Sequence, residues 1–348
     1  MKANRRMVIA AMSALAAPAI LRPGRARAAE VTLKLAHFLP PVAPAHAKLL
    51  KPWAEKVEAE SDGRISIRIY PSMQLGGTPP QLFDQVRDGV APLAWTLPGY
   101  TPGRFPRLET FELPFVAAPT AVVNAQAVQE FVSTQLGSEL DEVHLICAWA
   151  HDAGVIHSRK PVSDLASLQG LKLRFPNRLT GESLTALGAS PIGMPVPQVP
   201  ESLASGVIDG VVVPWEVVPA LKIQELVQYH VQFPGTPTFY VATMLVVMNK
   251  ATYDGLPDDL RTIIDANTGM ETAILAGKAF DEGSVAGKKA AEKRGNTITT
   301  LSDEETARWR EKTRPVVDTW LKAKQSEGVD GTKLLETAEE LIAKYQKP

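Results

Sequence analysis

Stretches in which every second residue is apolar alternate with stretches of helical spacing over the first hundred residues. Strand-like alternation occupies residues 31–36, 64–71 and 91–97, and apolar residues at helical spacing occupy residues 45–63 and 81–89. The order strand–helix–strand–helix–strand predicts an α/β unit with a largely parallel sheet.

The same order starts again after the middle of the chain. We predict further strands at residues 142–158, 171–175, 191–196, 207–213 and 243–250, and helices at residues 178–189 and 199–206. These elements predict a second α/β unit with a sheet of its own.

The last third of the chain is mainly helical. Residues 258–294 form one very long helical candidate, and we expect it to bend because each of its glycines weakens it by about 1 kcal/mol relative to alanine. Ser302 and Glu305 have the spacing of a capping box and predict the start of a late helix. A final helix is expected over about residues 332–346.

Residues 1–28 have the pattern of an export signal. The pair Arg5–Arg6 precedes an apolar run over residues 7–21, and small residues around Ala26 and Ala28 suit a signal peptidase. The arginine pair resembles a twin-arginine signal, while a general secretory signal and an uncleaved anchor are the alternatives. We therefore expect a periplasmic protein from which residues 1–28 are removed.

Charge and cysteine content narrow the class of protein. Removal of residues 1–28 takes away six basic and no acidic residues, which leaves a net charge of −7. An acidic exported protein lacks the basic patches that nucleic acid requires, so we expect no nucleic-acid partner. The sole cysteine, Cys147, lies in an apolar run and predicts a buried strand residue that forms no internal disulfide.

The sequence holds none of the common catalytic or cofactor motifs. GxGxxG, P-loop, HExxH and GxSxG patterns are absent, and no cysteine–histidine spacing suits zinc. Acidic pairs such as Asp258–Asp259 lie on polar helix ends, where solvated carboxylates are ordinary. We therefore predict no enzymatic activity, no metal and no cofactor, although an exported α/β enzyme acting on a small organic acid remains the alternative.

One arginine lies at the end of a strand where a ligand could reach it. Leu171, Leu173 and Phe175 alternate with Lys172 and Arg174. Ligands of open α/β sheets bind at the carboxyl ends of strands, and two facing units would form a cleft there. A guanidinium in that cleft can hold a carboxylate through two charge-assisted hydrogen bonds, whereas the alternative is a structural salt bridge to a neighbouring acid.

Three other residues at strand ends are candidates with equally ordinary structural explanations. Trp215 could stack on a ligand or pack at a hinge. Glu216 could orient Arg174, although a solvated side chain is favoured. His37 could donate to an anion or satisfy a loop carbonyl.

Four aromatic residues and one amide complete the candidate ligand-binding set. Phe239 and Tyr240 precede an apolar strand and could line the cleft or pack in the core. Trp95 and Tyr100 flank a Pro-Gly turn, and we expect one of them to face the cleft. Asn177 follows the strand that carries Arg174.

Several stretches in order along the chain together resemble the solute receptors of TRAP (tripartite ATP-independent periplasmic) transporters, the C4-dicarboxylate-receptor-like family. They are QLGG, QLFDQVRDG, FELPF, SLQGLKLRFPN, LGASPIGM, SGVIDGVVVPWE and VVMNKATYDGLPDDLR. The resemblance covers nearly all of the chain after residue 28. It implies a two-lobed α/β periplasmic binding protein fold with mixed sheets and a long helix that spans both lobes.

The resemblance also implies boundaries and partners. Lobe 1 would contain residues 29–153 and 243–290, lobe 2 residues 154–242, and residues 291–348 would form C-terminal helices packing across both. A receptor of this family delivers its solute to membrane permease subunits and does not itself span the membrane. A receptor that presents its ligand to a sensor protein is the other alternative.

In the family, the arginine of the motif G-L-K-[LIM]-R binds the carboxylate of the ligand, and that residue is Arg174 here. Many members carry an acid and an asparagine where this chain has Val212 and Val213, and sialic-acid members carry a second arginine near Gly154 and an aromatic near Val196. The polar groups that hold a sugar acid or a dicarboxylate are therefore missing. We expect a monocarboxylate with an apolar body, either an aromatic acid or a small 2-oxo or 2-hydroxy acid.

Overall fold

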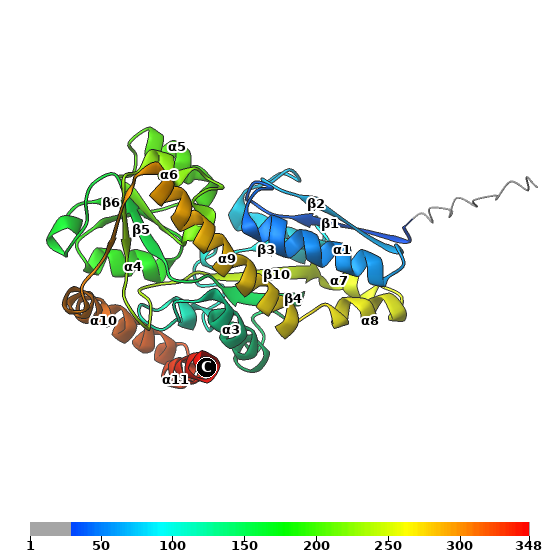
Figure 1. Ribbon diagram of the computed structural model, residues 1–348. Helices are drawn as coiled ribbons and strands as arrows, with labels where there is room; N and C mark the ends of the chain where they lie inside the picture. The colour runs from blue at the N-terminus through cyan, green and yellow to red at the C-terminus, as the bar shows by residue number, and fades with distance from the viewer. Residues whose placement is uncertain (1–28, 348) are drawn as a thin grey trace, which may run out of the picture.

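The computed structural model describes residues 29–347, and the predicted signal peptide lies outside them. Within that range the chain forms two sheets (Figure 1). Sheet 1 has the order β2-β1-β3-β10-β4, formed by β1 Val31–Ala36, β2 Ile65–Tyr70, β3 Leu93–Thr96, β4 Val143–Ala150 and β10 Thr243–Asn249. Strands β1, β2 and β3 are parallel, whereas β10 runs antiparallel to both of its neighbours.

Sheet 2 has the order β11-β9-β5-β8-β6-β7 and is also mixed. Its strands are β5 Val155–Ser158, β6 Lys172–Phe175, β7 Ser190–Gly193, β8 Gly210–Val213, β9 Tyr229–Gln232 and β11 Thr297–Thr300. We call the part of the molecule built on each sheet lobe 1 and lobe 2. The two mixed sheets agree with the fold that the family resemblance implies.

Helices cover both sheets. Those nearer the N-terminus are α1 Lys51–Glu60, α2 Leu82–Arg87, α3 Ala121–Gln135, α4 Arg178–Ala186, α5 Val199–Ala204 and α6 Ile223–Leu226. Those nearer the C-terminus are α7 Lys250–Asp254, α8 Asp258–Ala266, α9 Met270–Arg294, α10 Asp303–Ser326 and α11 Gly331–Gln346. Helix α10 contacts α4 and α11 contacts α3, so the C-terminal pair touches helices beside both sheets.

The single long helix predicted over residues 258–294 is wrong in one respect, because it is two helices. Helix α8 ends at Ala266 and α9 begins at Met270. Between them Gly269 has a φ of 86°, a conformation that glycine adopts at little cost and that breaks the helical path. The pattern predicted the helical segments correctly but did not place this break.

Helix α9 connects the two lobes, as the resemblance implies. It packs on α3, β4 and the π-helix η1 (Ala45–Leu50) of lobe 1, and on α6, β11 and the short helix η7 (Trp215–Val217) of lobe 2. Figure 1 shows α9 running diagonally from one lobe to the other. Two further connections cross between the lobes, from β4 to β5 and from β9 to β10.

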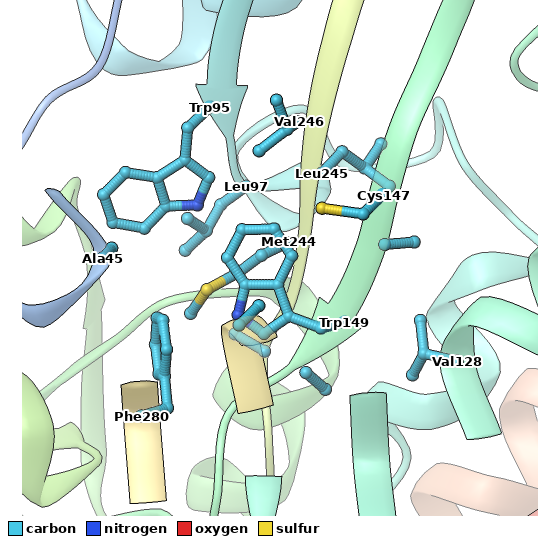
Figure 2. Packing of buried hydrophobic residues seen from close by; sticks show 14 of the residues in the cluster. Ala45, Trp95, Leu97, Val128, Cys147, Trp149, Met244, Leu245, Val246 and Phe280 are labelled. Carbon is cyan, nitrogen blue, oxygen red and sulfur yellow. The ribbon is translucent and has the colours of Figure 1, made fainter. Parts of the chain in front are cut away.

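The core of lobe 1 lies partly between sheet 1 and α9. Trp95 of β3, Met244 of β10 and Trp149 of β4 come from three neighbouring strands and gather near Phe280 of α9 (Figure 2). The rings of Trp95 and Trp149 stack at a centroid distance of 6.3 Å, and the ring of Phe280 meets Trp149 edge-on at 5.8 Å. Cys147 is buried in the same cluster, in agreement with its predicted place on an apolar strand.

The glycines of α9 have a packing role. A Cβ at Gly277 would lie 2.6 Å from the Cα of Val122, and one at Gly287 would lie 2.0 Å from the backbone oxygen of Trp215. These distances are far below van der Waals contact, so α9 approaches the backbone of both lobes only because these positions lack side chains. The glycines that weaken the helix locally therefore let it pack closely against its neighbours.

We predict that Gly287→Ala destabilises the fold although alanine favours helices. The methyl group meets backbone that cannot rotate away, and such overpacking costs about 2 kcal/mol, more than the ~1 kcal/mol that alanine contributes to the helix. Urea unfolding measures the difference, with Val285→Ala as control because Val285 is 58% exposed on the same helix. A Gly287→Ala protein as stable as the wild type would contradict the close-approach explanation.

Candidate functional site

A cleft between the two lobes holds most of the unusual polar and aromatic residues. Its empty volume is about 390 Å³. Lobe 1 contributes Phe38, Leu39, Trp95, Leu97, Tyr100 and Met244; the crossing segments contribute His151, Tyr240 and Ala242; lobe 2 contributes Arg174, Pro176, Val196, Val212, Val213, Pro214, Glu216 and Val217. We call this space the interlobe cleft. It lies where β1, β3, β6 and β8 end, which is where open α/β sheets bind ligands.

Arg174 is buried in the wall of this cleft. It lies on β6, between the parallel neighbours β7 and β8, and its side chain is 1% exposed. Nε donates to the carbonyl oxygen of Met194 (2.8 Å), Nη1 donates to that of Val212 (3.3 Å), and Nη2 lies 3.5 Å from the Tyr100 hydroxyl oxygen. These contacts fix the plane of the guanidinium.

No acid neutralises Arg174 among residues 29–347, since every ion pair found there joins other residues. Burial lowers the pKa of Arg174, but a guanidinium stays charged at any physiological pH. The three contacts leave two of the five guanidinium N–H groups without a protein partner. A buried cation in this state provides both the charge and the hydrogen-bond donors that a carboxylate requires.

Two tyrosines flank the guanidinium. The hydroxyl oxygen of Tyr100 accepts from the backbone N–H of Val196 (2.9 Å), so its own hydrogen is available to donate. The hydroxyl of Tyr240 is buried and has no hydrogen-bond partner among the described residues. Burial raises the pKa of both phenols, and the charge of Arg174 opposes that shift, so both are neutral donors at neutral pH.

The ring of Tyr240 also explains a glycine in the crossing segment. A Cβ at Gly154 would lie 1.9 Å from Cε1 of Tyr240, so no side chain fits there. This is the position near which sialic-acid receptors carry their second arginine. The ring of Tyr240 therefore leaves no room for a side chain at residue 154.

Aromatic rings form one wall of the cleft. The ring of Phe38 lies 4.6 Å from that of Trp95 and 5.8 Å from that of Tyr100, centroid to centroid. Trp95 reaches the cleft from the cluster drawn in Figure 2, where it lies beside Leu97 and Met244. Such a wall offers flat apolar surface to a planar ligand body.

His151 lines the cleft as a neutral structural group. Its Nδ1 lies 2.5 Å from the carbonyl oxygen of Asp152, and its Nε2 lies 2.9 Å from the backbone nitrogen of Ala242. A carbonyl only accepts and a backbone N–H only donates, so Nδ1 carries the proton and Nε2 accepts. Burial and then the charge of Arg174 lower the pKa of His151 to about 4. The ring therefore ties the two crossing segments together without adding charge.

Glu216 is buried, contrary to the solvated position that its sequence context favours. It is 3% exposed in η7, directly after β8 and Pro214. It neither pairs with Arg174 nor forms any other ion pair in the described part of the chain. Burial, and then the nearby Asp152, raises its pKa well above the usual range, which favours the neutral form of the group.

The structure places five of the nine predicted ligand-binding residues in the lining of the cleft: Trp95, Tyr100, Arg174, Glu216 and Tyr240. Trp215 packs instead against His157 and His230 at 4.9 Å. Phe239 packs against Phe233 and Trp309.

The remaining two predicted residues have their polar atoms occupied by the protein. The Asn177 side chain accepts from Thr180 N–H as the N-cap of α4 and donates to the Val241 carbonyl oxygen. His37 accepts from Leu39 N–H at Nδ1 and contacts His46 through Nε2. Neither lines the interlobe cleft.

Sequence reasoning missed several lining residues. Phe38 and Leu39 follow directly on His37 at the end of β1, so the strand-end rule pointed to the right loop but to the wrong residue in it. The strand-end rule does point to His151, at the end of β4, although the predicted ligand-binding set leaves it out. Met244 lies in the apolar run of β10 and gives no sequence signal of its own.

Among residues 29–347 no group of three or more histidines, cysteines, aspartates or glutamates is placed to hold a metal ion. In the same range no helix combines the length and the apolar character needed to cross a membrane.

Comparison with known proteins identifies the family. The model of bacterial extracellular solute-binding protein, family 7, matches residues 35–324. A marine metagenome TRAP solute-binding protein specific for aromatic acid ligands, solved with metahydroxyphenylacetate, is 46% identical, with a TM-score of 0.89 over 91% of this chain and 100% of that one. A TRAP solute-binding protein from Rhodoferax ferrireducens T118, solved with copurified benzoate, is 42% identical, with a TM-score of 0.88 over 90% and 98% of the two chains. The C4-dicarboxylate-binding periplasmic protein DctP of Rhodobacter capsulatus is 26% identical over 88% of this chain and 89% of its own.

We predict that His151 makes the fold sensitive to acid. Between pH 6.5, the usual pKa of histidine, and about 4, the unfolded chain binds a proton at this residue that the folded chain excludes. Because of this group, the free energy of unfolding therefore decreases by about 1.4 kcal/mol for each unit by which the pH is lowered within this range. Urea unfolding across that range should give a shallower fall for His151→Gln than for the wild type. Parallel curves for the two proteins would contradict the assignment.

Proposed function

The chain belongs to family 7 of the bacterial extracellular solute-binding proteins, the receptors of TRAP transporters, and on that premise we propose that it captures an aromatic monocarboxylate in its interlobe cleft. Members of this family are receptors and not enzymes, so the proposal contains no chemical step. The solute is bound outside the cytoplasm, after export directed by residues 1–28. Permease subunits in the membrane then receive it.

The observation that carries this proposal is the buried, acid-free cation of Arg174. The carboxylate of the ligand lies against the two free guanidinium N–H groups, and the hydroxyls of Tyr100 and Tyr240 donate to the same carboxylate. The planar body of the ligand then lies along Phe38 and Trp95. The aromatic acids bound by the relatives at 46% and 42% identity support this ligand class.

Closure of the two lobes on the ligand follows from the same contacts. Arg174 belongs to lobe 2, whereas Tyr100 belongs to lobe 1, so a carboxylate held by both is bound best when the lobes are together. A ligand shifts a conformational equilibrium only by its difference in affinity for the two states. We propose that the permease subunits recognise this closed form.

Replacement of Arg174 should strongly weaken the binding of benzoate. Loss of one partner of a buried charge pair costs 2–5 kcal/mol, so we expect Arg174→Ala to weaken binding by about a hundredfold or more, and Arg174→Lys to weaken it less. Isothermal titration with benzoate measures the affinity, and thermal unfolding without ligand establishes that each variant folds. Lys172→Ala is the matched control, because Lys172 lies exposed on the same strand. Equal benzoate affinity in Arg174→Ala and the wild type would disprove the role of Arg174.

The receptor should prefer monocarboxylates to C4 dicarboxylates. A second carboxylate would lie among Val212, Val213 and a neutral glutamic acid, where an unpaired charge costs several kcal/mol. We therefore expect benzoate to bind at least a hundredfold more tightly than succinate, measured by competition titration. Tighter binding of succinate would exclude the monocarboxylate class while leaving the receptor function intact.

A further inference from the structure

We propose that Glu216 forms a second polar end of the interlobe cleft and selects aromatic acids that carry a hydroxyl group on the ring. This inference rests on the proposed function and narrows its ligand class. Arg174, Tyr100 and Tyr240 form the proposed binding site for the ligand carboxylate. That site gives no role to Glu216, which also lines the cleft.

Glu216 is held in place without any polar contact. Its carboxyl group forms no hydrogen bond or ion pair in the described part of the chain, and Oε2 is fully buried. Helix α9 supports it from one side, since a Cβ at Gly283 would lie 3.0 Å from the Cβ of Glu216. The residue nevertheless lines the cleft. A buried carboxyl group without a partner is costly, and a ligand that supplies the partner recovers that cost.

The protonation state of Glu216 decides which ligand group suits it. Desolvation, and then the nearby Asp152, favours the neutral form. A neutral carboxylic acid both donates and accepts, so it pairs with a hydroxyl group in either direction. A second carboxylate would find only the single O–H of Glu216 to accept from and would otherwise lie unpaired in a desolvated position, so it is disfavoured. An ammonium group would require Glu216 to ionise in a desolvated position.

Arg174 and Glu216 line the same cleft without forming an ion pair, and the groups whose charges act on Arg174 are the phenols of Tyr100 and Tyr240. In this proposal a ligand that places its carboxylate on Arg174 presents another part of its body to Glu216. A ring hydroxyl is the group that an aromatic monocarboxylate most simply places there.

Titration with benzoate, 3-hydroxybenzoate, 4-hydroxybenzoate and 3-(aminomethyl)benzoate tests the proposal. We expect the wild type to bind at least one hydroxybenzoate about tenfold more tightly than benzoate, the effect of one buried hydrogen bond. Glu216→Gln, which keeps a neutral donor and acceptor, should retain most of that ratio. Glu216→Leu, which has neither, should bring the ratio of the two dissociation constants close to one. Lys172→Ala should keep the wild-type ratio.

The ratio of the dissociation constants of benzoate and hydroxybenzoate tests this inference separately from the proposed function. If benzoate binds but neither hydroxybenzoate binds more tightly, or if Glu216→Leu keeps the preference, the hydroxyl pocket is disproved and the receptor function stands. Tightest binding of 3-(aminomethyl)benzoate would mean that Glu216 is a counter-ion for an ammonium group, and would also overturn the inference. If no aromatic carboxylate binds, the proposed function and the inference fail together.

Discussion

The structure depends on one electrostatic constraint, a guanidinium buried between two lobes without an acid to neutralise it. Burying a charge is tolerable only when hydrogen bonds and an opposite charge compensate for lost hydration. Backbone carbonyls of Met194 and Val212 supply part of that compensation for Arg174. The missing part is a negative charge, and the cleft is the route by which it arrives. The architecture around the arginine therefore favours capture of an anion.

The fold keeps this unsatisfied group in position. Arg174 lies on β6 with a parallel strand on each side, which fixes its backbone. The cleft wall opposite belongs to the other lobe, and the crossing segments and α9 hold the lobes in register. Close packing of α9 on backbone at Gly277 and Gly287 makes this connection rigid along its length.

The sequence predicted those features that local patterns encode. Alternation located β1, β2 and β6, and the run of apolar residues located β10, whose residues are all buried. It did not predict α3, β9 or β11; β11 is a largely exposed edge strand whose pairing depends on a distant segment. In the cleft, Arg174 was predictable because a strand-end arginine is unusual. Trp215 packs against His230 and does not line the cleft. This choice depends on three-dimensional packing, which the spacing of residues along the sequence does not encode.

In the proposed function, Glu216 gives the cleft a selectivity that the arginine alone would not. A cleft with one cation and an apolar wall would bind any carboxylate with an apolar body. Burial, and then the charge of Asp152, raises the pKa of Glu216, which favours its neutral form, and burial also raises the pKa of Asp152 to about 8. The neutral carboxyl group of Glu216 repels a second anion only weakly. It does not, however, provide enough hydrogen-bond donors to replace the water molecules that the anion loses on burial. The same group matches a hydroxyl without any change of protonation. With the charged Arg174 and the neutral Glu216 both in its lining, the cleft thus suits a ligand with a single carboxylate. The two groups together would fix the orientation of that ligand in the cleft.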